Sequence, residues 1–139
     1  MLLHTPEDIR KLLSTTRTIA VVGLSDKPHR ASYEVSAYMQ SHGYRIIPIN
    51  PSLSEVLGER CYPSLSAAAL DHKLDMVDVF RNSADTPPVA QEALACHARS
   101  VWLQLGVSHP EVEAMCEAAG VPLVMDRCLK IDHARWLTT

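Results

Sequence analysis

The chain has 139 residues, of which 47% are hydrophobic and 21% are charged, and its formal net charge is -3. This length predicts one domain, residues 1–139, that buries a core without disulfide or metal staples, and the balance of charge argues against a general nucleic-acid binder. No apolar run approaches the roughly 20 residues of a membrane-spanning helix, and the N-terminus lacks the features of a signal peptide, so we expect a cytoplasmic protein without a membrane contact.

The first third of the chain alternates helix and strand signals. Thr5, followed by a proline, suits the cap and first turn of a helix. The apolar, β-branched run 18–23 then predicts a central parallel strand. A second helix is expected with Ser32 as its N-cap and Gly43 as its stop, and a second strand over 44–50 follows at once.

The remainder continues the alternation with short connections. We expect a short strand near Cys61 and a short helix from Pro63 or Ser64. Further strands are expected over 74–80, 100–107 and 121–126, and further helices capped by Thr86, opening at His109–Pro110, and over 131–137. Because parallel strands need crossovers, the pattern predicts an α/β fold: a doubly wound, mainly parallel, Rossmann-like sheet of about five strands with helices on both faces.

The loop after the first strand carries the clearest sign of a ligand. In open parallel sheets, ligands lie outside the carboxyl ends of the strands, where the strand order reverses. Gly23 allows close backbone approach, and the next helix presents free N–H groups. Two hydroxyls and two cations, on Ser25, Lys27, Arg30 and Ser32, add what a phosphate would need. The alternative is a solvated basic loop without a ligand.

The motifs of other nucleotide-binding classes are missing. The turn reads G-L-S-D-K-P rather than G-x-G-x-x-G, and the second strand ends in Asn50 rather than an acidic residue, which argues against NAD and leaves an NADP-type site open. No P-loop, G-x-S-x-G or H-E-x-x-H motif occurs, and we predict no catalytic residue. The four cysteines form no CxxC pair and are expected to be reduced structural thiols. Cys128 and His133 match no zinc spacing, so we predict no metal site.

A family resemblance rests on the loop after the first strand and on the segments IIPINP, DVFR, VWLQLGV and DRCLKIDH, taken together. Through these segments, the sequence resembles the family of stand-alone CoA-binding domains. These are small Rossmann-like proteins similar to the N-terminal domain of the succinyl-CoA synthetase alpha subunit. The resemblance runs from Thr18 to Leu137. It implies a ligand, coenzyme A or an acyl-CoA, bound at the carboxyl edge of the sheet.

The resemblance also implies roles for single residues. The phosphates would be held by Gly23, Ser25, Lys27, Arg30 and Ser32. The ribose or 3′-phosphate would lie along Asn50 and Pro51, the adenine between Phe80 and Arg81, and the path of the pantetheine arm along Gln104 and Gly106. Residues 126–130 would close the floor of the site. A ribose that carries a phosphate needs no carboxylate, which agrees with Asn50.

The resemblance implies binding without catalysis by this chain alone. In the larger synthetase the resemblance implies a phosphorylated histidine in a second domain and a partner subunit that activates the nucleotide, and we expect neither in this chain of 139 residues. The alternatives are an NADP-type oxidoreductase, an accessory subunit of an acyl-CoA ligase, and an interaction protein with a vestigial pocket. A protein partner or homodimer, and a disulfide between Cys128 and the CoA thiol, are left open.

Overall fold

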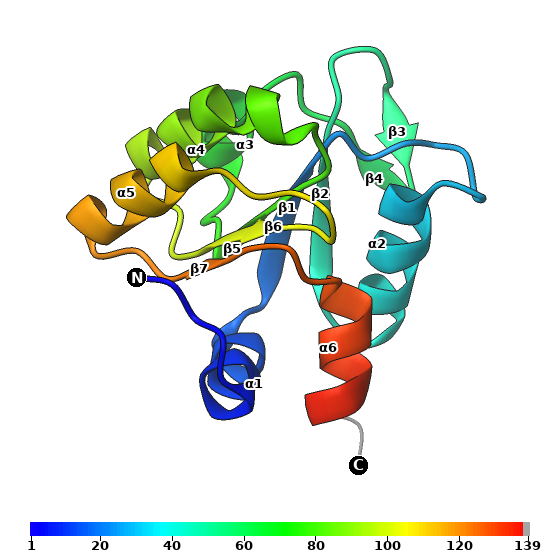
Figure 1. The fold of residues 1–139 in the computed structure, drawn as a ribbon. Coiled ribbons are helices and arrows are strands. Elements are labelled where there is room, and N and C mark those ends of the chain that lie inside the picture. The colour runs from blue at the N-terminus through cyan, green and yellow to red at the C-terminus, as the bar shows by residue number, and fades with distance from the viewer. Residues whose placement is uncertain (138–139) are drawn as a thin grey trace.

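The structure is a computed structural model that describes residues 1–137 (Figure 1). Its helices and strands follow in the order α1 (Pro6–Thr15), β1 (Thr18–Val22), α2 (Ala31–Ser41), β2 (Arg45–Ile49), β3 (Glu55–Val56), β4 (Glu59–Arg60), α3 (Leu65–Asp71), β5 (Met76–Val79), the 3-10 turn η1 (Ser83–Asp85), α4 (Thr86–Ala95), β6 (Val101–Leu103), α5 (Pro110–Ala119), β7 (Leu123–Val124) and α6 (Leu129–Trp136). No helix in this part of the chain is long and apolar enough to cross a membrane.

Five strands form one parallel sheet in the order β2-β1-β5-β6-β7. Val22, near the carboxyl end of β1, lies in register with Ile49 of β2 and Val79 of β5. The chain winds from β1 to β2 in one direction and from β5 through β6 to β7 in the other. The strand order therefore reverses between β1 and β5, which is where this class of sheet binds ligands.

Helices cover both faces of the sheet, with α3, α4 and α5 on one side and α1, α2 and α6 on the other (Figure 1). Successive strand residues point to opposite faces, so Val77 and Leu103 belong to the first core layer and Met76 and Trp102 to the second. The expected doubly wound α/β fold is confirmed.

Thr5 caps α1 as expected, and its side chain accepts the Asp8 N–H at 3.2 Å. Two other helix starts differ from the sequence expectation. Helix α2 begins after Arg30, and Ser32 lies inside it, where its Oγ accepts the Ser25 N–H at 3.0 Å. Thr86 is the first residue of α4 rather than its cap, because η1 precedes it and its hydroxyl donates to the Ser83 carbonyl at 2.7 Å.

Strands β6 and β7 are shorter than the expected 100–107 and 121–126. The backbone becomes left-handed at Gly106 (φ 83°) and at Asp126 (φ 57°), a conformation that a strand cannot contain. After β6 the chain forms a turn in which Leu105 and Gly106 are exposed.

The segment between β2 and α3 forms an antiparallel hairpin, β3 with β4, where only one short strand near Cys61 was expected. The short helix α3 begins after Ser64, whose Oγ accepts the Ala67 N–H at 3.1 Å, as expected. Helix α6 begins at Leu129, two residues before the expected start at 131.

The backbone segments that follow β1 and β5 approach each other closely just beyond the carboxyl ends of the two strands. Gly23 has φ 84°, and a Cβ atom at this position would lie only 2.5 Å from the Phe80 carbonyl oxygen. An L-residue here would meet both left-handed strain and a backbone clash. Glycine is therefore required where the strand order reverses.

Gly23→Ala is expected to destabilise the protein by more than Gly43→Ala. Gly43 also has a positive φ, 93°, but a Cβ there meets no atom within 4 Å, so only strain of about 1–2 kcal/mol applies. The clash at Gly23 adds to this strain. Urea denaturation of both variants measures the difference, and equal losses in the free energy of unfolding would contradict the close approach.

Candidate functional site

Three cavities of about 340–350 Å³ each lie side by side at the carboxyl edge of the sheet. The β2-side cavity is lined by Gly23, Ser25, Asp26, Asn50, Pro51, Ser52, Leu53 and Arg81. The α2-side cavity is lined by Gly23, Ser25, Lys27, Arg30, Ala31, Ser32 and Phe80. The β6-side cavity is lined by Ala31, Val35, Phe80, Arg81, Gln104, Leu105, Val107, Cys128 and Ile131.

The three cavities share walls and so form one groove. Gly23 and Ser25 belong to both the β2-side and the α2-side cavity, and Ala31 and Phe80 belong to both the α2-side and the β6-side cavity. Arg81 links the two outer cavities. The lining changes from polar and cationic at the first loop to mostly apolar beside β6. A larger cavity, about 790 Å³, lies between α1 and α6 and includes none of the predicted site residues.

Of the residues predicted to hold the phosphates, the adenosine and the pantetheine arm, all except Gly106 line one of these cavities. Gly106 lies in the exposed turn after β6, where its N–H donates to Asp126 Oδ1 at 2.6 Å. Asp126 thus holds this turn rather than the floor of the groove. Of residues 126–130, only Cys128 lines the β6-side cavity.

Three cations of the groove have no counter-ion. Lys27, Arg30 and Arg81 are exposed, and within residues 1–137 their side chains make no ion pair or hydrogen bond. The N-cap residue of α2 is Arg30, which makes no side-chain cap bond, and the Tyr33 N–H already donates to the Arg30 carbonyl at 3.1 Å. The Ala31 and Ser32 N–H groups have no acceptor among the described residues and remain available for an anion. The α2-side cavity therefore combines free cations with a helix N-terminus.

Two of the shorter polar side chains of the groove, those of Asn50 and Ser25, bind the backbone of its loops. The Asn50 amide donates to the Leu24 carbonyl at 3.0 Å and accepts the Ser52 N–H at 2.9 Å. The Ser25 hydroxyl accepts the Lys27 N–H at 3.1 Å. These groups fix the shape of the two loops.

The apolar end of the groove contains residues that the sequence analysis did not assign to a site. Leu105 is 67% exposed and Ile131 is 51% exposed, although both are large and apolar, and they flank the β6-side cavity with Val35 and Cys128. Ile131 and Cys128 are brought here by α6, which follows the last strand. Leu105 and Ile131 lie within the segments VWLQLGV and DRCLKIDH, but no local pattern gave either of them a role, and only Ile131 has charged neighbours.

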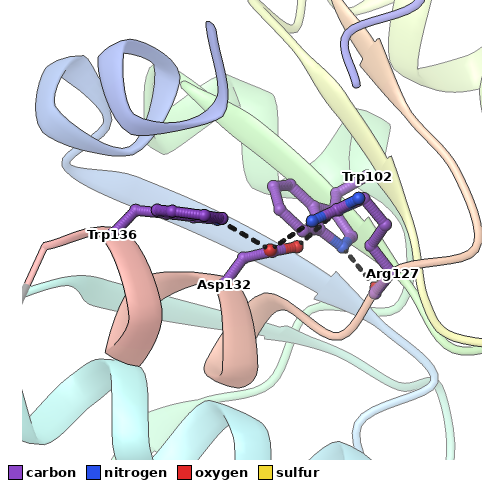
Figure 2. A network of polar contacts seen from close by, with 4 residues as sticks. All are labelled: Trp102, Arg127, Asp132 and Trp136. Carbon is purple, nitrogen blue, oxygen red and sulfur yellow. Dashed lines mark hydrogen bonds and ion pairs between the residues drawn. The ribbon is translucent and has the colours of Figure 1, made fainter. Parts of the chain in front are cut away.

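A buried polar network holds the start of α6 against β6 (Figure 2). Asp132, 2% exposed, accepts two hydrogen bonds from Arg127, at 2.8 and 2.7 Å, and one from Trp136 Nε1 at 3.1 Å. Trp102 Nε1 donates to the Arg127 carbonyl at 2.8 Å. His133 Nδ1 lies 2.9 Å from the Tyr38 hydroxyl, so the polar residues near Cys128 serve contacts between elements.

Asp78 is a second group that the sequence analysis did not use. It lies within β5, is 0% exposed, and its Oδ1 accepts a hydrogen bond of 2.5 Å from Gln104 Nε2. Burial raises the pKa of Asp78 to about 7, an effect that the Gln104 amide and the Val79 backbone only partly offset. The signal in the sequence was a carboxyl side chain within an otherwise apolar strand. Asp78 does not line the groove itself but contacts Gln104, which lines the β6-side cavity.

Comparisons with known proteins agree on one family. Residues 17–134 match the family described as CoA binding domain. YneT, an uncharacterised protein of Bacillus subtilis strain 168, is 42% identical over 127 residues, which are 91% of this chain and 93% of that protein. A solved structure from Thermus thermophilus is 38% identical, with a TM-score of 0.87 over 96% of this chain and 100% of its own. An ADP-forming acetate–CoA ligase of Methanocaldococcus jannaschii is 24% identical over 82 residues, 59% of this chain but 11% of the ligase.

Asp78→Asn is expected to change how stability depends on pH. The folded-state pKa of about 7 lies above the ordinary 3.8, so the folded protein binds this proton more tightly than the unfolded chain does. The contribution of Asp78 to stability therefore falls as pH rises towards 7 and is lowest above it. Relative to the parent, the variant should gain about 2–3 kcal/mol between pH 5 and pH 8. Denaturation curves at both pH values measure this gain, and a constant difference would contradict it.

Proposed function

This chain belongs to the family of CoA binding domains, and from this premise we propose that it binds coenzyme A or an acyl-CoA in the groove at the carboxyl edge of its sheet. Coenzyme A joins a 3′-phosphorylated adenosine, a pyrophosphate and a long pantetheine arm. A site for it must accept several negative charges at one end and a largely apolar chain at the other.

The observation that carries this proposal is the gradient along the groove. Unpaired Lys27 and Arg30 lie beside the N-terminus of α2, while Leu105 and Ile131 flank the far end. Unpaired cations at a helix N-terminus attract phosphate groups, and apolar walls favour a chain of methylene groups. One continuous ligand with both characters fits the order in which the cavities adjoin.

The cavities suggest how the ligand lies. The pyrophosphate occupies the α2-side cavity, beside Lys27 and Arg30, and the adenosine with its 3′-phosphate extends into the β2-side cavity past Pro51. Arg81 lines both the β2-side and the β6-side cavity, so it lies near the ligand in each of them. Phe80 lines the α2-side and β6-side cavities, so it contacts the start of the pantetheine arm rather than the adenine. Asn50 acts by shaping its loop.

We propose no reaction for this chain on its own. The similarity to part of an ADP-forming acetate–CoA ligase favours a second candidate role, in which this chain holds CoA for a partner that carries the ligase chemistry. The two roles share the same ligand site and differ only in whether a partner is recruited. Co-purification of an ATP-dependent partner would favour the second.

Replacing both Lys27 and Arg30 with Ala is expected to weaken CoA binding by about 2–4 kcal/mol, because a hydrogen bond to a charged group contributes about 1.5–3 kcal/mol. Isothermal titration calorimetry at low salt measures the loss. The matched control is Lys73→Ala with Arg99→Ala, two exposed cations that line none of the three cavities of the groove.

Three outcomes would count against the proposal. Unchanged CoA affinity in the variant that lacks both Lys27 and Arg30 would show that the phosphates bind elsewhere. A parent protein that binds NADPH but not CoA would favour an oxidoreductase. Absence of binding to either ligand at millimolar concentration would favour an interaction protein with a vestigial pocket.

A further inference from the structure

Gln104 lies at the inner wall of the β6-side cavity, and its side-chain amide has two unlike ends. The residue is 4% exposed, and its Nε2 donates to Asp78 Oδ1. Its Oε1 makes no hydrogen bond with the described residues, yet it is not among the buried side-chain atoms without a partner. The carbonyl end of the amide is therefore open to the cavity.

Asp78 decides which end of this amide points outward. An ionised carboxylate only accepts hydrogen bonds, so only the NH₂ end of Gln104 can face it. Register places Val21 and Trp102 on either side of Asp78, and Trp102 Nε1 is already bonded to the Arg127 carbonyl. Within residues 1–137, Gln104 is the one side chain that donates to this carboxyl.

Stability alone gives no reason for a carboxyl at this place. Asp78 is fully buried, and its Oδ2 has no hydrogen-bond partner among the described residues. A buried polar atom without a partner destabilises the folded state by about 1–3 kcal/mol. An apolar residue of similar volume would fit the surrounding core of Val21, Met76 and Trp102 better.

We infer that Asp78 is a positioning residue for the ligand: it turns the Gln104 amide so that Oε1 faces the β6-side cavity and accepts an N–H of the pantetheine arm. This inference rests on the proposed function. In a mostly apolar cavity, one fixed acceptor sets the depth and orientation of the arm, since few polar groups determine specificity in such sites. Asp78 itself does not touch the ligand.

The test is a double-mutant cycle on ligand binding at pH 8, above the pKa of about 7, where Asp78 is ionised. Asp78→Asn lets Gln104 bond in either orientation, and Gln104→Met removes the amide while keeping the side-chain length. Each variant and the double variant are titrated with CoA and with adenosine 3′,5′-bisphosphate, which lacks the pantetheine arm. Circular dichroism confirms that each variant is folded.

Each single variant is expected to bind CoA about 3- to 10-fold more weakly, the effect of one neutral hydrogen bond, and to bind adenosine 3′,5′-bisphosphate as the parent does. Because Asp78 acts through Gln104, adding Asp78→Asn to Gln104→Met should weaken CoA binding no further. A merely structural Asp78 would give additive effects, or equal losses for both ligands.

Several results would overturn the inference. These are unchanged CoA affinity in either single variant, equal weakening of both ligands, or additive losses in the double variant. If Asp78→Asn does not fold, the result for Gln104→Met decides. A Gln104→Met variant that binds CoA as tightly as the parent would show that Gln104 Oε1 does not accept a hydrogen bond from the ligand. A parent protein that binds neither ligand refutes the proposed function itself, an outcome distinct from a parent that binds both with no effect of the variants.

Discussion

The groove exists because two backbone segments meet where the strand order reverses. The Phe80 carbonyl oxygen lies only 2.5 Å from the position that a Cβ atom at residue 23 would take, so glycine is required where β1 and β5 turn away from each other to opposite faces. Helix α2 then rises on one side of this point, and the turn after β5 leaves on the other. The three cavities all border this meeting point, through Gly23, Phe80 or both.

The polar residues around this point divide their tasks. Those with short side chains, Ser25, Ser32 and Asn50, form hydrogen bonds to loop backbone and so set the shape of the walls. The long cationic side chains of Lys27, Arg30 and Arg81 have no ion pair or hydrogen bond to any residue of the described part, 1–137. A rigid loop that presents unpaired charge loses little conformational freedom when an anion binds, which is the advantage of preorganisation.

The strand-and-helix alternation could be predicted from sequence because each element carries its own signal. The apolar run of β1 and the capping Thr5 act locally, and both predictions hold. Predictions failed where a tertiary contact overrides local preference. Ser32 bonds to the first loop instead of capping α2, and strand β6 ends early, before the left-handed backbone at Gly106. The apolar end of the groove was missed because Leu105 and Ile131 come from elements whose proximity only the fold reveals.

The order in which the chain supplies the groove has a consequence for its synthesis. The α2-side cavity is lined by residues within 23–32 and by Phe80, whereas the β6-side cavity also needs Cys128 and Ile131 at the start of α6, which the Arg127–Asp132 pair holds in place. A nascent chain can therefore offer the phosphate half of the groove long before the apolar half exists. The complete groove is available only after every strand and the start of α6 have been translated, so contact with the full length of the ligand belongs to the last stage of maturation.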